Sequence, residues 1–389
     1  MLPSQDRKRT LIFAGFAHAL HDGYTDLIYV LLPVWQAEFG LAYSTLALLR
    51  GLYAGAMAAF QIPAGRLSER LGGRVVLSLG MGIAALGYAL AGWSGGLLGL
   101  CAALTLSGIG SSTQHPVASA AVSQAYGDNA RVALGIYNFS GDLGKAAIPA
   151  ATALLLTIMP WRSALWLLAS VGCAAAVAIG MFLPVVRRAQ PPMKSKQSAS
   201  EGRGGFPLLF AIGILDTGVR MGLLTFLPFL LQSKGASLSM IGLALSLVFV
   251  GGAAGKFACG WLGGRLGVVR TVVLTEGATA AGIFAAMMLP LAPILVLLPV
   301  LGIALNGTSS VLYGTVPELA PADRTERAFA VFYTGTIGSG AIAPVLYGLL
   351  GDVTGLPFAV VATAITALAT IPLAFALAPY LSRPSTRSG

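Results

Sequence analysis

The sequence predicts an all-α membrane protein with twelve transmembrane helices arranged as two repeats of six. Three observations predict this fold class. First, 56% of the 389 residues are hydrophobic and only 10% are charged, whereas soluble domains carry about 25% charged residues. Second, the apolar residues gather in long runs separated by short polar breaks. Third, motifs of the first half of the chain recur in the second half at a constant distance.

Twelve apolar runs are long enough to cross a bilayer, whose hydrocarbon core needs about 20 residues of helix. The breaks between the runs are rich in Gly, Pro, Asp and Asn, which favour turns. The longest polar stretch, residues 187–204, predicts a cytoplasmic linker between bundles at 1–186 and 205–389. The predicted spans are residues 11–34, 44–65, 74–93, 97–120, 132–157, 163–184, 206–231, 239–262, 269–289, 292–314, 328–350 and 357–379.

The basic residues predict the orientation of these spans. With both termini placed in the cytoplasm, nearly all lysines and arginines outside the spans fall in cytoplasmic loops, and only Arg162 and Lys234 fall outside. This bias is the positive-inside rule of membrane proteins. The net charge of +10 is therefore explained by the basic residues of the cytoplasmic loops and not by nucleic-acid binding. We expect a multi-pass protein of the inner (cytoplasmic) membrane with no nucleic-acid partner.

The motifs of several other protein classes are missing from the sequence. It has no phosphate-binding Gly-Lys-Ser/Thr loop, no HExxH pair and no framed catalytic triad. Its cysteines, Cys101, Cys173 and Cys259, lie in apolar stretches without a partner at metal spacing. We therefore expect a protein that is not an enzyme, has no cofactor, metal or disulfide, and acts as a monomer in the lipid bilayer on a small-molecule substrate and protons.

The internal repeat has an offset of 195 residues. Pro33 matches Pro228 near the outer ends of the first and seventh spans. After the second and eighth spans, Gly65, Leu67, Arg70, Leu71 and Gly72 match Gly260, Leu262, Arg265, Leu266 and Gly267. In transporters built from two parallel repeats of six helices, the substrate binds near the membrane midplane, between the repeats.

Residues 65–74 (GRLSERLGGR) resemble the signature loop of the major facilitator superfamily. Glu69 stands where the family usually has Asp, and Gly73 stands where it usually has a base. The resemblance implies the major facilitator fold and a cytoplasmic gate in which the acid meets a helix N-terminus of the other half. The alternative is a plain basic loop that sets topology. The predicted gate residues in this loop are Gly65, Glu69, Arg70, Gly72 and Arg74.

Spans 4 and 5 resemble the fosmidomycin-resistance branch of this superfamily. Span 4 is rich in Gly and ends in His115-Pro116, and span 5 carries residues 141–146 (GDLGKA) where the branch has Gly-Asn-x-Gly. Asp142 replaces the amide, and Lys145 is an added charge. The resemblance implies proton-driven antiport that exports a small polar or drug-like molecule. We place His115 with the gate residues as a capping or loop contact, with a proton relay as the alternative.

Ionisable residues inside spans cost roughly 2.5–3.5 kcal/mol each on insertion scales, and those that are kept usually face a water-filled cavity. In span 1, His18, Asp22 and Asp26 recur every fourth residue and share one helix face. Two carboxylates one turn apart repel each other, so one of them is expected to keep a proton. We predict that Asp22, Asp26, His18 and His21 couple transport to protons; the alternative is static pairing of an acid with a basic residue.

Five further spans carry charges. Asp216 and Arg220 have the favourable helix spacing for an internal ion pair, with anion binding by Arg220 as the alternative. Arg50 is expected to pair with Asp26 or to guard the outer vestibule. The predicted substrate-binding residues are Arg50, Asp142, Lys145, Asp216, Arg220 and Tyr29, and Lys256 and Glu276 are further predicted gate residues. A symporter or uniporter for an organic anion is the alternative function.

Overall fold

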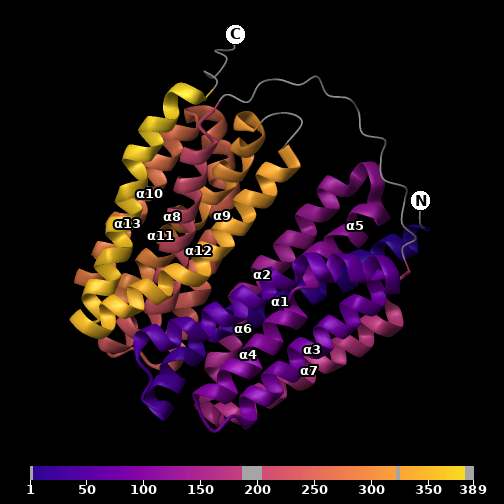
Figure 1. The fold of residues 1–389 in the computed structure, drawn as a ribbon. Helices are drawn as coiled ribbons and strands as arrows, with labels where there is room; N and C mark the ends of the chain where they lie inside the picture. Colours follow the sequence, from indigo (N-terminus) through magenta and orange to yellow (C-terminus); the bar gives the residue numbers. More distant parts are fainter. Residues whose placement is uncertain (1–2, 186–203, 321–324, 382–389) are drawn as a thin grey trace. The chain divides into compact units, whose positions relative to one another are not determined.

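The computed structural model describes residues 3–185, 204–320 and 325–381, and every regular element in these ranges is a helix (Figure 1). The predicted linker at 187–204 lies outside the described residues except for its last position. The prediction of an all-α chain is confirmed for the described residues.

The first half of the chain folds into long helices joined by short turns. A π-helical turn at Gln114–Ala118 joins α4 to α5, so the fourth predicted span is a broken helix. The helices are α1 (Ser4–Phe39), α2 (Tyr43–Leu71), α3 (Gly73–Trp93), α4 (Leu97–Ser111), α5 (Ser119–Tyr126), α6 (Ala130–Ile158) and α7 (Trp161–Phe182).

The second half has the same plan. Its helices are α8 (Phe206–Ser233), α9 (Leu238–Leu266), α10 (Val268–Met288), α11 (Leu291–Leu319), α12 (Thr325–Thr354) and α13 (Leu356–Leu377). By its internal contacts the chain forms two compact units, which we call the first unit (Met1–Pro192 with Leu231–Ser246) and the second unit (Met193–Leu230 with Leu247–Gly389). The sequence predicts Leu231–Ser246 as part of the second bundle, whereas by its contacts this segment belongs to the first unit. One of these contacts is a hydrogen bond that the Ser246 hydroxyl donates to the Ala146 carbonyl of α6.

The helix boundaries agree with the predicted repeat. Adding 195 to the bounds of α2, α3 and α7 yields the bounds of α9, α10 and α13. Gly72 and Gly267 separate the second and third helix of each half, with φ of 85° and 80°. Only glycine adopts such angles readily, because it has no Cβ. Since α2 continues to Leu71, most of the predicted signature loop is helical and the turn is Gly72 alone.

Ten helices of the described chain are long and apolar enough to cross a membrane. Two of the twelve predicted spans are not among them. In the first, the polar residues of α1 lower the hydropathy of the helix. In the fourth, α4 has only 15 residues before the π-helical turn. Twelve spans in two repeats therefore remain a prediction that this helix arrangement supports.

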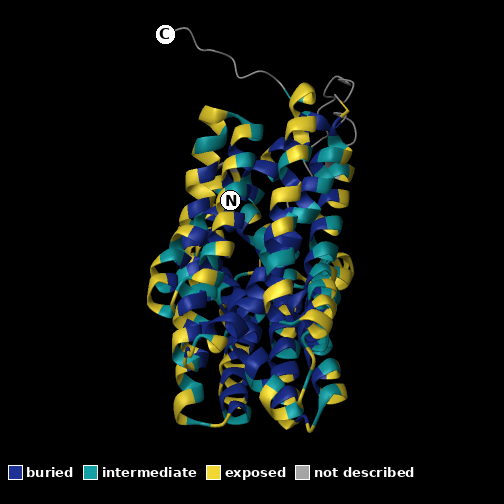
Figure 2. Cartoon of the chain, turned by 90° about the vertical axis from the view of Figure 1, so that its left-hand side faces the viewer, coloured by how far each residue is buried: buried dark blue, intermediate teal, exposed yellow. Residues whose placement is uncertain are grey.

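The surface of the helices carries many large apolar side chains. Figure 2 shows exposed residues distributed along the helices together with the buried ones. Among the exposed residues are large apolar side chains such as Leu98, Ile158 and Val353, which are 85%, 77% and 86% exposed. In water such a surface would drive aggregation, whereas lipid solvates it. The burial pattern is that of a protein in a bilayer.

Helices α1 and α6 approach each other closely because α6 has glycine at the contact. A Cβ at Gly144 would overlap the backbone carbonyl of Ala19, and a Cβ at Gly141 would meet the side chains of His18 and Asp22. The Ser140 hydroxyl donates a hydrogen bond to the Gly15 carbonyl, at 2.9 Å. Such small residues allow helix backbones to pack tightly in membranes. This contact brings the polar face of α1 against α6.

We predict that Gly144→Val destabilises the protein by about 1–3 kcal/mol, because an added side chain at a packed contact forces the helices apart. The measurement is thermal unfolding of the purified protein in detergent. Gly135→Ala is the matched control, since Gly135 lies on the same helix with nothing within 4 Å of its Cβ position. Equal melting temperatures for wild type and Gly144→Val would contradict the assigned contact.

Candidate functional site

The polar residues of α1 form the centre of the candidate site in the first unit. His18, His21, Asp22 and Asp26 are 3%, 3%, 6% and 5% exposed. The predicted polar face of span 1 is therefore turned into the protein and not toward lipid. Burial of four ionisable groups in one helix requires partners for them from neighbouring helices.

Asp22 has three nitrogen-containing neighbours. Its carboxylate lies 3.4 Å from the ammonium of Lys145 on α6, and 3.5 Å and 3.7 Å from the Nε2 atoms of His18 and His21. The sequence predicted Lys145 as a substrate-binding residue; in the structure it supplies the counter-charge of Asp22. For Asp22 this contact agrees with the alternative to proton coupling, in which an acid of span 1 forms a static pair with a basic residue. Asp142 lies three residues before Lys145 on α6, a spacing from which the sequence also predicts that the two can pair, and this pairing stays a prediction.

Hydrogen bonding sets the orientation of the His18 ring. Its Nδ1 lies 2.8 Å from the carbonyl oxygen of Tyr137 on α6, and the ring stacks on the Tyr137 ring at 4.1 Å between centroids. A carbonyl only accepts, so Nδ1 carries the hydrogen. In the neutral ring, Nε2 then presents its lone pair toward Asp22, and Nε2 is buried without a hydrogen-bond partner.

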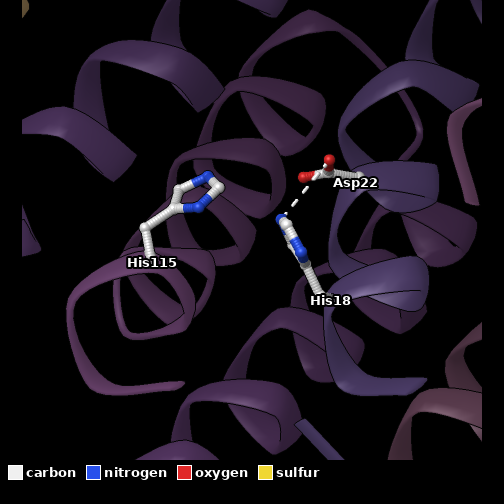
Figure 3. A group of neighbouring side chains, drawn as sticks. All are labelled: His18, Asp22 and His115. Atoms are coloured by element: carbon white, nitrogen blue, oxygen red, sulfur yellow. Dashed lines mark ion pairs between the residues drawn. The ribbon is translucent and has the colours of Figure 1, made fainter. Parts of the chain in front are cut away.

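His115 joins this group from the π-helical turn. Its ring lies edge-on to the rings of His18 and His21, at 5.3 Å and 4.9 Å between centroids. Figure 3 shows the side chains of His115, His18 and Asp22 around a shared space. The sequence placed His115 with the gate residues, whereas the structure places it with the α1 cluster. Short π-helical turns often occur at functional sites.

A second polar group of the first unit surrounds Arg50, which is buried on α2. Its Nε donates to the Tyr29 hydroxyl at 3.2 Å, and its guanidinium lies 5.5 Å from the centre of the Tyr29 ring. Asp26 is near enough to Arg50 to act on it electrostatically, and the pairing of the two residues stays a prediction. The Tyr53 hydroxyl bonds those of Ser111 and Thr25 at 2.7 Å and 3.1 Å.

Sequence reasoning missed Tyr53 and Tyr137. Tyrosines in apolar runs look like packing residues, and no spacing in the sequence marks these two as neighbours of the charged groups. Their roles depend on which helices meet, and the sequence carries no signal for that.

The predicted gate residues of the signature loop lie at the end of α2, at the turn and at the start of α3. A cavity of about 500 Å³ is lined there by Gly65, Glu69, Gly72 and Arg74, together with Pro116, Val117 and Gln124 after α4. Arg70 belongs to the last turn of α2. In the second unit, Lys256 is exposed on α9. The gate role of these residues stays a prediction.

The second unit buries two acids. Asp216 on α8 and Glu276 on α10 are 3% and 1% exposed, and their carboxyl groups lie within hydrogen-bond reach of each other. Thr308 of α11 lies beside Glu276, but its hydroxyl donates to Thr275 at 2.8 Å. Oε2 of Glu276 is buried without a hydrogen-bond partner. The sequence predicted Glu276 as a gate residue; the structure places it in a buried polar cluster with Asp216.

Arg220 lies near these acids but bonds hydroxyl groups. Its guanidinium donates to Ser309 and Thr217 at 3.3 Å and 3.5 Å, and its Nε is buried without a partner. Among the described residues, no Asp216–Arg220 ion pair occurs within 4.0 Å, so the expected pair is wrong. Asp216 instead faces Glu276 on α10, a neighbour that helix spacing alone cannot reveal.

Comparison with known proteins places both halves in one family. The model of the Major Facilitator Superfamily matches residues 11–210 and 208–389. The chain is similar to a probable sulfoacetate transporter of Cupriavidus necator (26% identity; 85% of each chain) and to the fosmidomycin resistance protein of Escherichia coli (24%; 88% of this chain and 86% of that one). It is also similar to human monocarboxylate transporter 11 (24%; 74% of this chain), of which it covers 65%.

Solved structures show the same fold. A bacterial homologue of the human lysosomal transporter Spinster, in an inward-facing and occupied conformation, superposes with a TM-score of 0.83 at 16% identity. The match covers 98% of both chains.

We predict that Lys145→Met destabilises the protein more than Asp22→Asn does. Removal of Lys145 leaves a carboxylate whose side chain is only 9% exposed, whereas removal of the Asp22 charge leaves an ammonium whose side chain is 32% exposed and stays hydrated. We expect about 2–4 kcal/mol for the first change and less for the second. The measurement is thermal unfolding in detergent with a chelator present. The double variant should lose less than the sum of the two; strict additivity would show that the pair is not coupled.

Proposed function

The chain belongs to the Major Facilitator Superfamily, and we propose that it is a proton-coupled antiporter that exports a small polar or drug-like organic molecule across the inner membrane by alternating access. The family acts on small molecules within a membrane, and the named relatives are transporters rather than enzymes. The name of the Escherichia coli relative favours resistance by export. The direction of transport, its coupling to protons and the class of substrate are what we propose beyond membership of the family.

One observation carries the proton coupling: the second unit buries two acids side by side, with the half-buried Arg220 near them. Ionised carboxylates only accept hydrogen bonds, so Asp216 and Glu276 can bond each other only when they share a proton. The pair then carries one negative charge, which balances Arg220. Loss or gain of one further proton changes the net charge of a buried cluster, and such a change favours a different conformation. Among the described residues, Tyr313 of α11 is a further ionisable neighbour of Asp216 and Arg220, and its ring lies 4.7 Å from that of Tyr333 on α12.

This proposal places the coupling residues in the second unit. The sequence predicted them in span 1, where Asp22 already has Lys145 as its counter-charge and Asp26 interacts with Arg50. A role of Asp22, Asp26, His18 and His21 in coupling stays a prediction. The shared proton of Asp216 and Glu276 supports coupling without them.

In antiport, substrate and proton compete for the same acids. A substrate with a positive or hydrogen-bond-donating group replaces the shared proton, so its binding releases that proton. By linkage, proton uptake lowers the affinity for substrate by the same factor. This competition exchanges one ligand for the other during alternating access.

We predict that Glu276→Gln abolishes the dependence of transport on an imposed pH gradient, because an amide cannot bind or release the proton. Exchange of substrate without a gradient should continue. The measurement is flux of labelled fosmidomycin and sulfoacetate in proteoliposomes, with efflux from cells carrying or lacking the gene as a wider screen. Glu38→Gln is the control, since Glu38 belongs to the first unit and forms an ion pair with Arg162, with 2.6 Å between the charged atoms. Gradient-driven flux by Glu276→Gln at the wild-type rate would refute the proposed coupling.

A second candidate function is symport or uniport of a small organic anion, and Arg220 favours it. The guanidinium keeps a buried Nε without a partner, and its other contacts are neutral hydroxyl groups. An anionic group can therefore add to it without breaking an ion pair within 4.0 Å. Arginine binds planar anions by two parallel hydrogen bonds, which lysine cannot form. The names of two relatives specify sulfoacetate and monocarboxylates, which are organic anions.

For this second function we predict that Arg220→Lys weakens anion binding at least tenfold and that Arg220→Ala abolishes it. The measurement is the stabilisation of the purified protein against heat by sulfoacetate, titrated for each variant. Symport also requires proton uptake when the anion binds, whereas antiport requires proton release. A pH-sensitive dye in weakly buffered solution shows whether the pH rises or falls on binding and so distinguishes the two. Unchanged affinity in Arg220→Ala would exclude anion recognition by this residue.

A further inference from the structure

All three histidines of the chain meet at one place in the first unit. His18 and His21 come from α1, and His115 comes from the π-helical turn almost one hundred positions later. The three ring centroids are separated by 4.9–6.3 Å. The acid–base contact of Asp22 with Lys145 does not need any of these rings. Three imidazole rings this close together suggest that they bind a common ligand.

His18 is oriented as a metal ligand would be. Its Nδ1 hydrogen bonds the Tyr137 carbonyl at 2.8 Å, which leaves the Nε2 lone pair for a ligand. Metal-binding histidines usually bond a carbonyl or carboxylate through their other nitrogen in this way. Nε2 has no hydrogen-bond partner in the protein, and it lies 3.5 Å from an oxygen of Asp22. An imidazole nitrogen and a carboxylate oxygen are both metal ligands, so a cation between these two atoms would contact one donor of each kind.

The donor atoms are close enough for one ion. One ligand atom from each of His18, Asp22 and His115 lies within 4.8 Å of the others. Donors bound to tetrahedral zinc at about 2.0–2.1 Å stand roughly 3.4 Å apart, so small side-chain movements close the site. His115 is the least buried of the three, which leaves a path of entry on its side. Figure 3 shows all three side chains around the common space.

We propose that His18, Asp22 and His115 bind a divalent transition-metal ion of the zinc, cobalt or nickel class. Two imidazoles and a carboxylate suit such ions, and three protein ligands leave one position open for water or a solute. Lys145 must release Asp22 when the ion binds, and its long, part-exposed side chain allows that movement. The ion then replaces the ammonium as the counter-charge of Asp22.

The proposal goes beyond the proposed transport function and does not depend on it. The sequence predicted no metal because it contains no HExxH pair and no cysteine at metal spacing. His115 is remote along the chain from His18 and Asp22. Only the contact of α1 with the π-helical turn completes the set.

The test is zinc binding to the purified full-length protein in detergent, prepared with an affinity tag that contains no histidine and stripped with a chelator. Calorimetric titration with zinc chloride should show one ion per chain for the wild type. His115→Gln and His18→Gln should each lower the affinity tenfold or more. Cys173→Ser, which removes an exposed thiol elsewhere, should leave it unchanged.

Cobalt(II) supplies a second readout, because its visible absorption strengthens when nitrogen and oxygen ligands hold it in a four- or five-coordinate site. Wild-type protein should show this absorption, and His115→Gln should not. His115→Cys keeps a metal ligand and should retain binding, which separates lost ligation from lost folding. Absence of zinc binding by the wild type, or equal affinity in the wild type and His115→Gln, overturns the proposal. Flux is not measured, so failure of the transport proposal cannot produce either outcome.

Discussion

An ionised side chain inside a bilayer must find its partner within the protein, since lipid offers none. The polar organisation of both units follows from this constraint. Asp22 is matched by Lys145 from α6, and Arg50 is matched by the hydroxyl and ring of Tyr29 together with the charge of Asp26. Each pairing joins different helices, so the same contacts that neutralise charge also define which helices are neighbours.

The two halves share a backbone plan but not a chemistry. Their helix boundaries repeat at one offset, and a glycine with positive φ separates α2 from α3 and α9 from α10. At that offset His21 of the first half corresponds to Asp216 of the second. The first unit surrounds an acid with bases, whereas the second unit places two acids beside one base. A substrate or proton that binds in one half therefore meets a different balance of acidic and basic groups from one that binds in the other half.

Close packing of α1 on α6 links the fold to the site. Gly144 allows the two backbones to approach, and Gly141 leaves room for His18 and Asp22. At this separation the Tyr137 carbonyl can set the orientation of the His18 ring. The unusual turn at Gln114–Ala118 adds His115 to the same space. A glycine contact between helices thus determines the ligand chemistry available to the buried histidines.

The sequence by itself determined the membrane class, the helical content, the repeat and the family, because hydropathy, helix period and motif spacing are local properties of the chain. It also identified most charged residues of the two clusters, since charges inside apolar runs are conspicuous. Only the tertiary structure decided their partners. Asp216 faces Glu276 and makes no direct ion pair with Arg220, Lys145 contacts Asp22, and His115 joins His18. These pairs come from different helices, and the packing that joins them depends on side-chain shape around the whole bundle, which local spacing does not encode.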